Sequence, residues 1–300
     1  MVAEKMVKAF KFGEDLWDPS HRFETSWLLS PYVLFACRAL FAVYALTTLF
    51  FTIGYQCTHP AAGSAYACQA SAASFSYFTV LTYWGIAFYM VFAAIHTFTY
   101  ARWNVALLDK FPRPLQALHA FYYSTITTYP FLVTIVYWGI LYTYGSAWFP
   151  TRYAAWSNLS EHGFNSFFAL FELFLTRTNP APWIHILWLI VVLALYLALA
   201  YVTRVTKGFY VYSFLDPTVM QHGLVAAYVF GIAIAIVIIF ALVKGATWTR
   251  KWLTEQKLGM EGKYAHGGRN AGSDSTSSWR DEQDVELASS RELHKGSPRA

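Results

Sequence analysis

The chain has 300 residues, of which 56% are hydrophobic and 13% are charged, and its formal net charge is +5. This composition excludes an average soluble domain, because the apolar residues are gathered in six blocks that are each near the length needed to cross a bilayer. It also excludes a nucleic-acid-binding protein, because the basic residues form no cluster interleaved with base-stacking aromatic side chains.

The sequence predicts an all-α, polytopic membrane protein, a six-transmembrane-helix bundle with a disordered C-terminal tail. Residues 1–30 form a polar cytoplasmic segment whose aromatic side chains suit the membrane interface. The membrane domain occupies residues 31–248, and residues 249–300 form a polar, charged tail that is expected to be disordered. The predicted spans, in chain order, are residues 31–54, 75–99, 119–144, 159–177, 183–203 and 221–246.

The distribution of Lys and Arg predicts how the helices are oriented. Most of these residues lie in the N-terminal segment, in the connections after the second and fourth spans, and beyond Lys244. The opposite connections contain only Arg152, Arg204 and Lys207. Because basic residues favour the cytoplasmic side, both termini are expected in the cytoplasm. The protein is expected to be an integral, multi-pass protein of the endoplasmic reticulum or plasma membrane, without a cleavable signal peptide.

The first connection on the outer side contains two cysteines, Cys57 and Cys68. That side is oxidising in the reticulum lumen or at the cell exterior, so a disulfide and a pair of free thiols are both open at this point. A disulfide would close a short loop and stabilise the fold by about 2–3 kcal/mol. Two cysteines fall short of the four ligands of a structural zinc site, so zinc is not expected.

The fourth predicted span contains ionisable groups within an apolar sequence, with His162 near one end and Glu172 inside. At about 100° per residue, these two residues and Asn165 fall on one narrow stripe of a helix. Ionisable groups within a bilayer are costly and usually face a protein interior or a watery cavity. The stripe therefore predicts a reactive or binding site inside the bundle.

The topology divides this stripe into two depths. His162 falls in the outer half of the membrane, whereas Glu172 falls at the inner depth of Arg38 in the first span. An Arg38–Glu172 ion pair would satisfy both charges and would be structural, because an unpaired buried charge costs several kcal/mol. In the alternative, Glu172 accepts a proton or orients a substrate.

The second predicted span places Thr79 and Thr82 on one side of a helix. Thr82 lies about 10 Å below the outer end, a depth compatible with that of His162. A hydroxyl and an imidazole at the same depth match the pattern of a nucleophile and its base. The alternatives are a threonine that bonds its own backbone and a histidine at the membrane interface.

No metal or other cofactor is expected. Three histidines map to the outer side, His59, His162 and His222, but their spacing matches no metal-binding signature. His222 therefore counts only as a possible supporting residue of the candidate site. The sequence also lacks the glycine-rich and nucleophile-elbow motifs of nucleotide-binding proteins and soluble hydrolases.

Several motifs resemble one known family in their order and spacing. They are VLTYW in the second span, NLSEHGFNSFFALFELFLTRT in the fourth, and TKGFYVYSFLDP before the sixth. Together they resemble the androgen-induced and androgen-dependent TFPI-regulating membrane protein family. The resemblance covers residues 75–245 and leaves out the N-terminal segment and the tail, as in a divergent branch such as a fungal one.

The resemblance implies a threonine hydrolase that acts on fatty acid esters of hydroxy fatty acids within the membrane. The family's nucleophile would fall on Thr82 in VLTY and its histidine on His162 in EHGFNS. Thr79 takes the place of Thr82 if the helix register shifts by one turn.

The expected function is an intramembrane lipid ester hydrolase whose partner is a lipid substrate in the bilayer. Thr82 would attack the ester, His162 would act as base, and Asn165 would support the oxyanion. The alternative is a non-enzymatic multi-pass membrane scaffold or a small transporter, in which Arg38 and Glu172 line a path.

Overall fold

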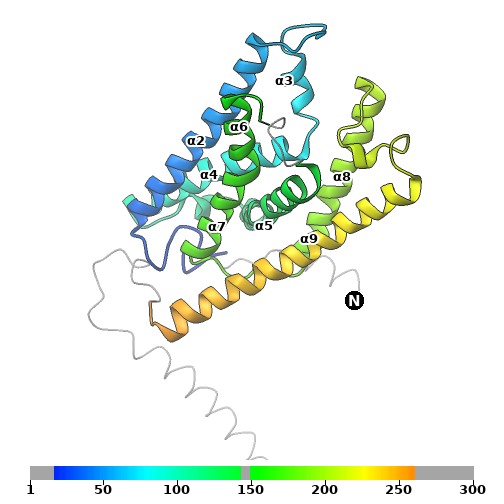
Figure 1. Ribbon diagram of the computed structural model, residues 1–300. Coiled ribbons are helices and arrows are strands. Elements are labelled where there is room, and N and C mark those ends of the chain that lie inside the picture. Colours follow the sequence, from blue (N-terminus) through cyan, green and yellow to red (C-terminus); the bar gives the residue numbers. More distant parts are fainter. Residues whose placement is uncertain (1–16, 143–148, 261–300) are drawn as a thin grey trace, which may run out of the picture. The chain divides into compact units, whose positions relative to one another are not determined.

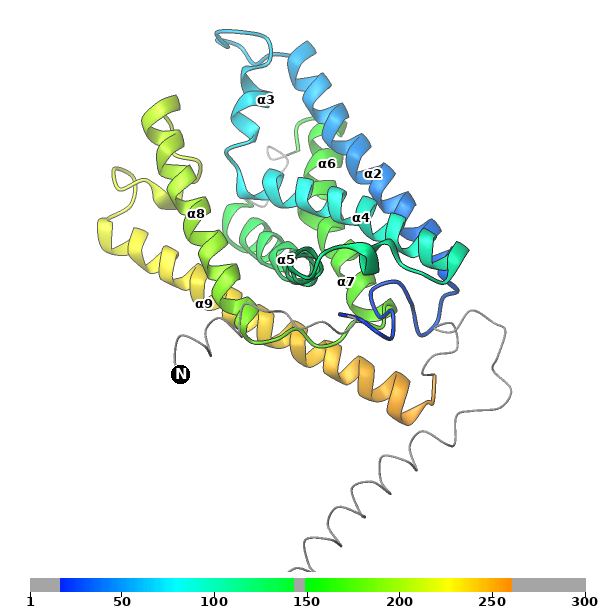
Figure 2. The same ribbon diagram turned by 180° about the vertical axis from the view of Figure 1, so that it is seen from behind.

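The computed structural model describes residues 17–142 and 149–260 of the chain. The regular elements within these ranges are helices, and one isolated bridge pairs Ser26 with Thr176. Figures 1 and 2 show the helices from opposite sides. The all-α class predicted from the sequence is therefore confirmed for the described part of the chain.

Five helices are long and apolar enough to cross a membrane, and they closely overlap the first, second, third, fifth and sixth predicted spans. They are α2 (Pro31–Thr58), α4 (Phe78–Trp103), α5 (Arg113–Val136, extended by η2, Tyr137–Leu141), α8 (Ile184–Lys207) and α9 (His222–Lys251, extended by η5, Trp252–Lys257). Shorter elements connect them: α3 (Gln69–Ser74), η1 (Leu107–Lys110) and η4 (Ser213–Leu215). The composition and length of the long helices support the membrane class.

The fourth predicted span is divided into three consecutive helical pieces and is not among these five. They are α6 (Arg152–Leu159), η3 (Ser160–Phe164) and α7 (Asn165–Leu175). The middle piece, η3, has π-helical hydrogen bonding, which is rare in proteins and is frequent at functional sites.

Local sequence signals explain where the long helices begin and end. α2 begins directly after Ser30 with Pro31, whose fixed φ suits the first helical position. α4 ends at Asn104, with φ of 56°, and α8 ends at Gly208, with φ of 82°. Both residues tolerate the left-handed conformation that commonly ends a helix.

The helices pack around two main apolar clusters. In the first, α2 lies against α4, with Ala45, Tyr83 and Met90 fully buried. In the second, α5 packs against α8 and α9 around Leu189 and Phe240. Figures 1 and 2 show α5 between the α2–α4 pair and the α8–α9 pair.

The outward faces of the long helices carry large apolar side chains. Val205 is 84% exposed, Phe230 69% and Leu242 67%. Exposed apolar surface on this scale is unusual for a soluble monomer. A face of this kind suits the lipid of a bilayer.

Residues 17–30 form part of the packed structure. Glu24, Thr25 and Ser26 are almost completely buried. Arg177 N donates to the Thr25 carbonyl at 3.1 Å, and the Ser26 hydroxyl donates to the Leu175 carbonyl. This part of the predicted cytoplasmic segment therefore covers the end of α7. Residues 1–16 lie outside the described residues.

The predicted boundary of the tail at residue 249 is too early. The helix of α9 and η5 continues to Lys257. Thr254 and Glu255 are buried on it, and Glu255 forms an ion pair with Arg22. Packing against the N-terminal segment accounts for the longer helix. The rest of the predicted tail, from residue 261, lies outside the described residues.

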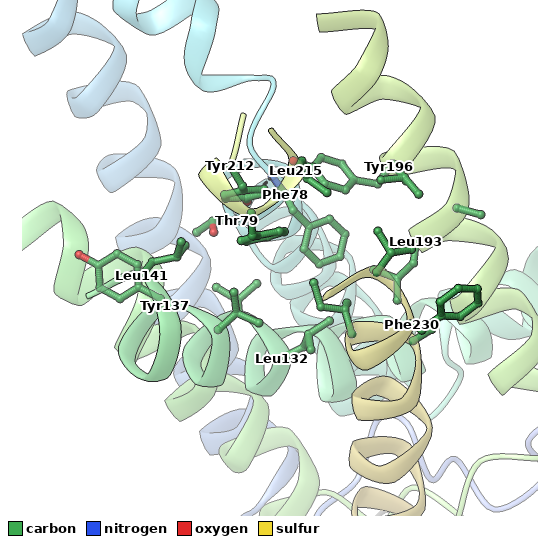
Figure 3. Close-up of a pocket in the computed structure, with 18 of the residues that line it drawn as sticks. Phe78, Thr79, Leu132, Tyr137, Leu141, Leu193, Tyr196, Tyr212, Leu215 and Phe230 are labelled. Carbon is green, nitrogen blue, oxygen red and sulfur yellow. Dashed lines mark hydrogen bonds between the residues drawn. The ribbon is translucent and has the colours of Figure 1, made fainter. Parts of the chain in front are cut away.

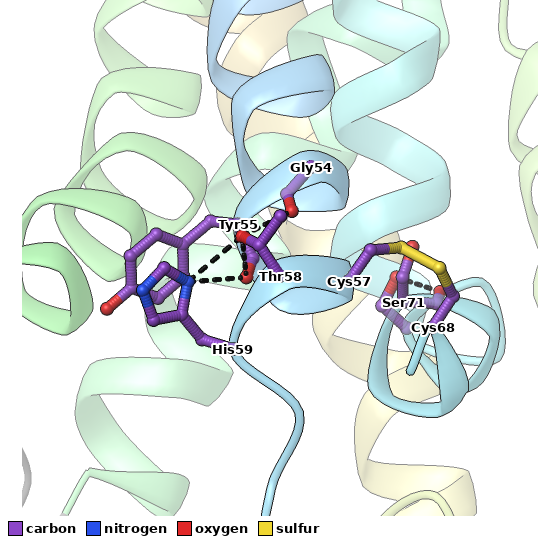
Figure 4. The surroundings of a disulfide bond; sticks show 8 residues. Gly54, Tyr55, Cys57, Thr58, His59, Cys68 and Ser71 are labelled. Atoms are coloured by element: carbon purple, nitrogen blue, oxygen red, sulfur yellow. Dashed lines mark hydrogen bonds between the residues drawn. A yellow bond between two sulfur atoms is a disulfide. The ribbon is translucent and has the colours of Figure 1, made fainter. Parts of the chain in front are cut away.

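A disulfide joins Cys57, at the end of α2, to Cys68, just before α3 (Figure 4). This settles the choice between a disulfide and two free thiols. Cys37, in the second turn of α2, is a free and half-buried cysteine. We call the end of the helices nearest the Cys57–Cys68 bond the disulfide end, and the end covered by residues 17–30 the segment end.

We expect the Cys57→Ser/Cys68→Ser variant to lose about 2–3 kcal/mol of unfolding free energy, because the unfolded chain gains the freedom of an open loop. Denaturant titration in detergent measures the change. Cys37→Ser is the matched control, with an expected change of about 0.5 kcal/mol or less. Equal effects of the two variants would contradict a stabilising role for the disulfide.

Candidate functional site

The most deeply buried charges form an ion pair between α2 and α7. Arg38 donates from Nε to Glu172 Oε1 and from Nη2 to Glu172 Oε2, both at 2.7 Å. Both side chains are 0% exposed. The two parallel bonds match the planar guanidinium to the carboxylate. The predicted ion pair is confirmed, and its use of both carboxylate oxygens favours the structural role of Glu172.

The same guanidinium connects two further parts of the structure. Arg38 Nη1 donates to Thr97 Oγ1 on α4 at 2.5 Å and to the Phe23 carbonyl at 2.8 Å. The backbone carbonyl of Glu172 accepts from the Tyr123 hydroxyl of α5 at 3.1 Å. The ion pair is therefore the centre of a polar network that joins α2, α4, α5, α7 and the N-terminal segment.

Glu24 is a buried carboxyl for which the sequence analysis proposed no role. It is 1% exposed, and within the described chain its Oε1 has no hydrogen-bond partner. Burial, together with repulsion from Asp18 and Asp109, raises the pKa of the Glu24 carboxyl well above its ordinary value. No sequence signal could have indicated this, because the burial arises from the folding of residues 17–30 over the helix ends.

His162 lies in η3, closer to the disulfide end than Glu172. Its side chain is 9% exposed, and Nδ1 lies 3.0 Å from the Asn158 carbonyl oxygen. A carbonyl oxygen can only accept, so Nδ1 carries the proton and Nε2 of the neutral ring keeps a lone pair. The ring stacks on Tyr137, with the centroids 3.6 Å apart and the planes at 20°. The tautomer is the one that a general base at Nε2 needs.

The hydrogen bonds around η3 show how the π-helical turn is held. The His162 carbonyl accepts from Thr134 Oγ1 at 2.9 Å and from Trp138 Nε1 at 3.0 Å. The Ser166 amide, the group that bonds this carbonyl in a regular α-helix, donates to Asn165 Oδ1 at 2.6 Å. Asn165 is 1% exposed and bonds this turn. In the described structure its side-chain oxygen is therefore engaged in the backbone turn.

Thr82, the predicted nucleophile, lies on the wall of an apolar cavity of about 510 Å³ between α4, α5 and α8. Its hydroxyl donates to the Thr79 carbonyl at 3.0 Å, the backbone bonding that the sequence analysis kept as an alternative. The lining of this cavity includes no residue of α6, η3 or α7, and His162 is therefore not part of it. Thr82 and His162 share no cavity wall.

Thr79, the alternative nucleophile, lies on the wall of a second apolar cavity, of about 240 Å³ (Figure 3). Tyr137 and Leu141 line the same cavity, and Tyr137 is the residue that stacks on His162. The Tyr212 hydroxyl lies beside Thr79 and bonds the Phe78 amide at 3.2 Å. Thr79 and the ring that stacks on His162 thus line the same cavity.

Sequence reasoning missed Tyr137. It is one of 21 tyrosines, and its position in the third predicted span carries no motif. The signal that matters is spatial, because the ring covers one face of His162 while also facing the cavity. Only the packing of η2 against η3 shows this relation.

The remaining predicted residue, His222, does not join the candidate site. It is the first residue of α9 and is exposed. His59 is also exposed and stacks on Tyr55, as Figure 4 shows. Among the described residues no group of three or more His, Cys, Asp or Glu side chains is placed to hold a metal ion.

We expect Arg38→Met to lower the unfolding free energy by about 3–5 kcal/mol, because it leaves the Glu172 carboxylate buried without a counter-charge. The Arg38→Met/Glu172→Leu double variant should be destabilised by less than the sum of the single variants, which a double-mutant cycle measures. Arg152→Met, at an exposed arginine, is the matched control. Additive effects would show that the ion pair carries no coupling.

We expect Glu24→Gln to stabilise the protein at neutral pH. The Glu24 pKa is raised in the folded state, so the wild type gains stability below the ordinary pKa of 4.5 and loses it as the pH rises through the folded value. Melting temperatures across this range should fall less steeply in the variant. An unchanged slope, or lower stability at neutral pH, would show that Glu24 is not a source of this dependence.

Comparison with known proteins gives no relative of the chain. No family model, no curated protein and no solved structure matches it. The motifs that resemble the androgen-induced family therefore remain the source of the expected activity. The geometry around His162 is the independent ground on which a function can be proposed.

Proposed function

We propose that the chain is an intramembrane lipid ester hydrolase in which a threonine of α4 is the nucleophile and His162 is the base. The observation that carries this proposal is the apolar cavity with Thr79 on its wall and Tyr137, stacked on His162, beside it. A hydroxyl, an imidazole and space for an acyl chain are the three parts that such a reaction needs. Both termini are proposed to be cytoplasmic, because most basic residues lie on that side.

The shape of the apolar space suits a lipid with two chains. The cavities of about 240 and about 510 Å³ share Phe78 and Tyr196 in their walls. Thr79 lies in one wall and Thr82 in the other, one helical turn apart. A fatty acid ester of a hydroxy fatty acid has two chains that meet near the ester, which fits a pair of adjoining cavities.

The geometry favours Thr79 as the nucleophile over Thr82, because its cavity includes the ring that contacts His162. His162 Nε2 would remove the threonine hydroxyl proton as Oγ1 attacks the ester carbonyl. The alkoxide of the leaving group takes this proton from the imidazolium, and an acyl-threonine remains. Water, deprotonated by the same nitrogen, then attacks the acyl group, and the carboxylic acid and free threonine are released.

Tyr137 must move for this reaction to occur. Its ring covers a face of His162, and its hydroxyl donates to Asn158 Oδ1 at 2.7 Å. Catalytic hydrogen bonds often form only when substrate is present. We propose that the entering chain displaces the Tyr137 ring and opens the imidazole to the cavity.

The transporter alternative needs a polar path through the bundle, and its candidate residues do not supply one. Arg38 and Glu172 are 0% exposed and bonded to each other. A static scaffold requires no cavity at all, so the two apolar cavities favour the hydrolase over it as well.

The test uses the full chain purified in detergent, with a fluorophosphonate probe and a branched fatty acid ester as substrate. We expect His162→Ala and Thr79→Ala to lower turnover by about 100-fold or more and to abolish labelling, because each removes a partner in proton transfer. Thr206→Ala is the matched control, since Thr206 is an exposed threonine of α8 that bonds the Val202 carbonyl and lines none of the three described cavities.

Loss of activity in Thr82→Ala with normal activity in Thr79→Ala would move the nucleophile to Thr82. Normal labelling and turnover in His162→Ala and in both threonine variants would contradict the hydrolase. Absence of any turnover or labelling in the wild type would leave the scaffold as the better account.

A further inference from the structure

A third cavity, of about 270 Å³, lies near the disulfide end between α2, α4 and α6, and it differs in chemistry from the two apolar cavities. Its wall shares no residue with either of them. The lining includes several polar and aromatic side chains: Thr52, Gln56, Phe75, Trp84, Tyr153 and Glu161. The proposed hydrolase makes no use of this space.

Glu161 gives the cavity its charge. It lies in η3, directly before His162, and lines the cavity. Glu161 belongs to none of the ion pairs between described residues, and no hydrogen bond between described residues reaches its carboxylate. Glu161 is half-buried, and a carboxylate that is partly withdrawn from bulk water without a counter-charge is costly. An occupant with a positive charge would remove this cost.

The aromatic side chains of the wall favour a cation of a particular kind. Trp84 and Phe75 stack with centroids 6.3 Å apart and planes at 23°, and Tyr153 stacks on Tyr55 at 3.8 Å. Indole and phenol faces attract organic cations through the ring quadrupole, and cages of such rings recognise ammonium groups. Phe75, Trp84 and Tyr153 line the cavity, so their rings contribute apolar, electron-rich surface to its wall.

Two polar side chains of the wall are incompletely bonded. Trp84 Nε1 and Gln56 Oε1 are buried without a hydrogen-bond partner among the described residues, although the Gln56 side chain interacts with the Tyr153 hydroxyl. The amide oxygen can accept from an ammonium N–H, and the indole N–H can donate to an oxygen carried next to the charge. A divalent metal is a poor fit, because calcium requires six to eight oxygen ligands and the wall offers one carboxylate.

We propose that this cavity binds an organic ammonium group, with Glu161 as its counter-ion and the Trp84 ring as its aromatic face. The ammonium can belong to a free amine such as choline or ethanolamine, or to the headgroup of a lipid. The two sources present the same chemistry to the cavity and differ in whether an acyl chain is needed for binding.

The experiment measures binding to the purified full-length chain. Choline and ethanolamine are titrated against tryptophan fluorescence in detergent, and thermal stability is compared in nanodiscs of phosphatidylcholine and of phosphatidylglycerol. We expect wild-type binding that Glu161→Gln weakens by about ten-fold or more, because the counter-charge is lost. Asp216→Asn, which removes a carboxylate whose hydrogen bonds lie within its own loop, is the matched control and should bind normally.

Trp84→Phe provides a second variant, which keeps a ring but removes the indole, and is expected to weaken binding less than Glu161→Gln. Saturable binding of free choline or ethanolamine supports the free amine as ligand. Stabilisation by phosphatidylcholine alone, lost in Glu161→Gln, supports the lipid headgroup. Absence of both effects in the wild type, or equal binding by wild type and a folded Glu161→Gln, would overturn the proposal. Hydrolase activity is not part of the readout, so either proposal can fail alone.

Discussion

The contact between Arg38 and Glu172 is the constraint on which the arrangement of the helices depends. A charged side chain within an apolar bundle requires a partner that meets it with good geometry, and here both carboxylate oxygens are used. This requirement sets how α2 and α7 are rotated about their axes. The further bond to Thr97 and the bond to the Phe23 carbonyl extend the same requirement to α4 and the N-terminal segment.

The two ends of the bundle differ in their polar contacts and in their cavities. At the segment end the Arg38–Glu172 and Arg22–Glu255 ion pairs join separate parts of the chain, although Glu24 Oε1 is buried there without a hydrogen-bond partner among the described residues. Nearer the disulfide end the helices enclose two apolar cavities and one polar cavity, and groups such as Glu161 remain without partners. Buried polar atoms without partners in the described chain therefore occur at both ends of the helices, whereas the polar cavity lies nearer the disulfide end.

Much of the framework could be predicted from the sequence because it depends on position along the chain. The hydropathy of the sequence predicted the positions of the five long helices. The similar depths of Arg38 and Glu172 in the membrane predicted their ion pair. The position of Cys57 and Cys68 in one outer loop was compatible with the disulfide. The candidate site was harder to predict from the sequence. The depth of a residue in the membrane does not determine toward which neighbouring helix its side chain points. Thr82 and His162 were matched in depth, yet Thr82 lines the larger cavity whereas His162 lines none of the three described cavities. The position of Tyr137 against His162 follows from helix packing.

The π-helical turn η3 has a consequence for how this chain can vary in length. Such a turn is equivalent to one residue added to an α-helix. The added residue rotates the side chains of α6 by about 100° around the helix axis relative to those of α7. Glu161 can therefore face its cavity while Glu172, eleven positions later in the numbering, keeps its alignment with Arg38. Removing a single residue between Ser160 and Phe164 would make α6 and α7 one regular α-helix and would remove this rotation between their side chains. We infer that the fold of this short stretch, as distinct from the roles proposed for Glu161 and His162, tolerates substitution better than a change of length.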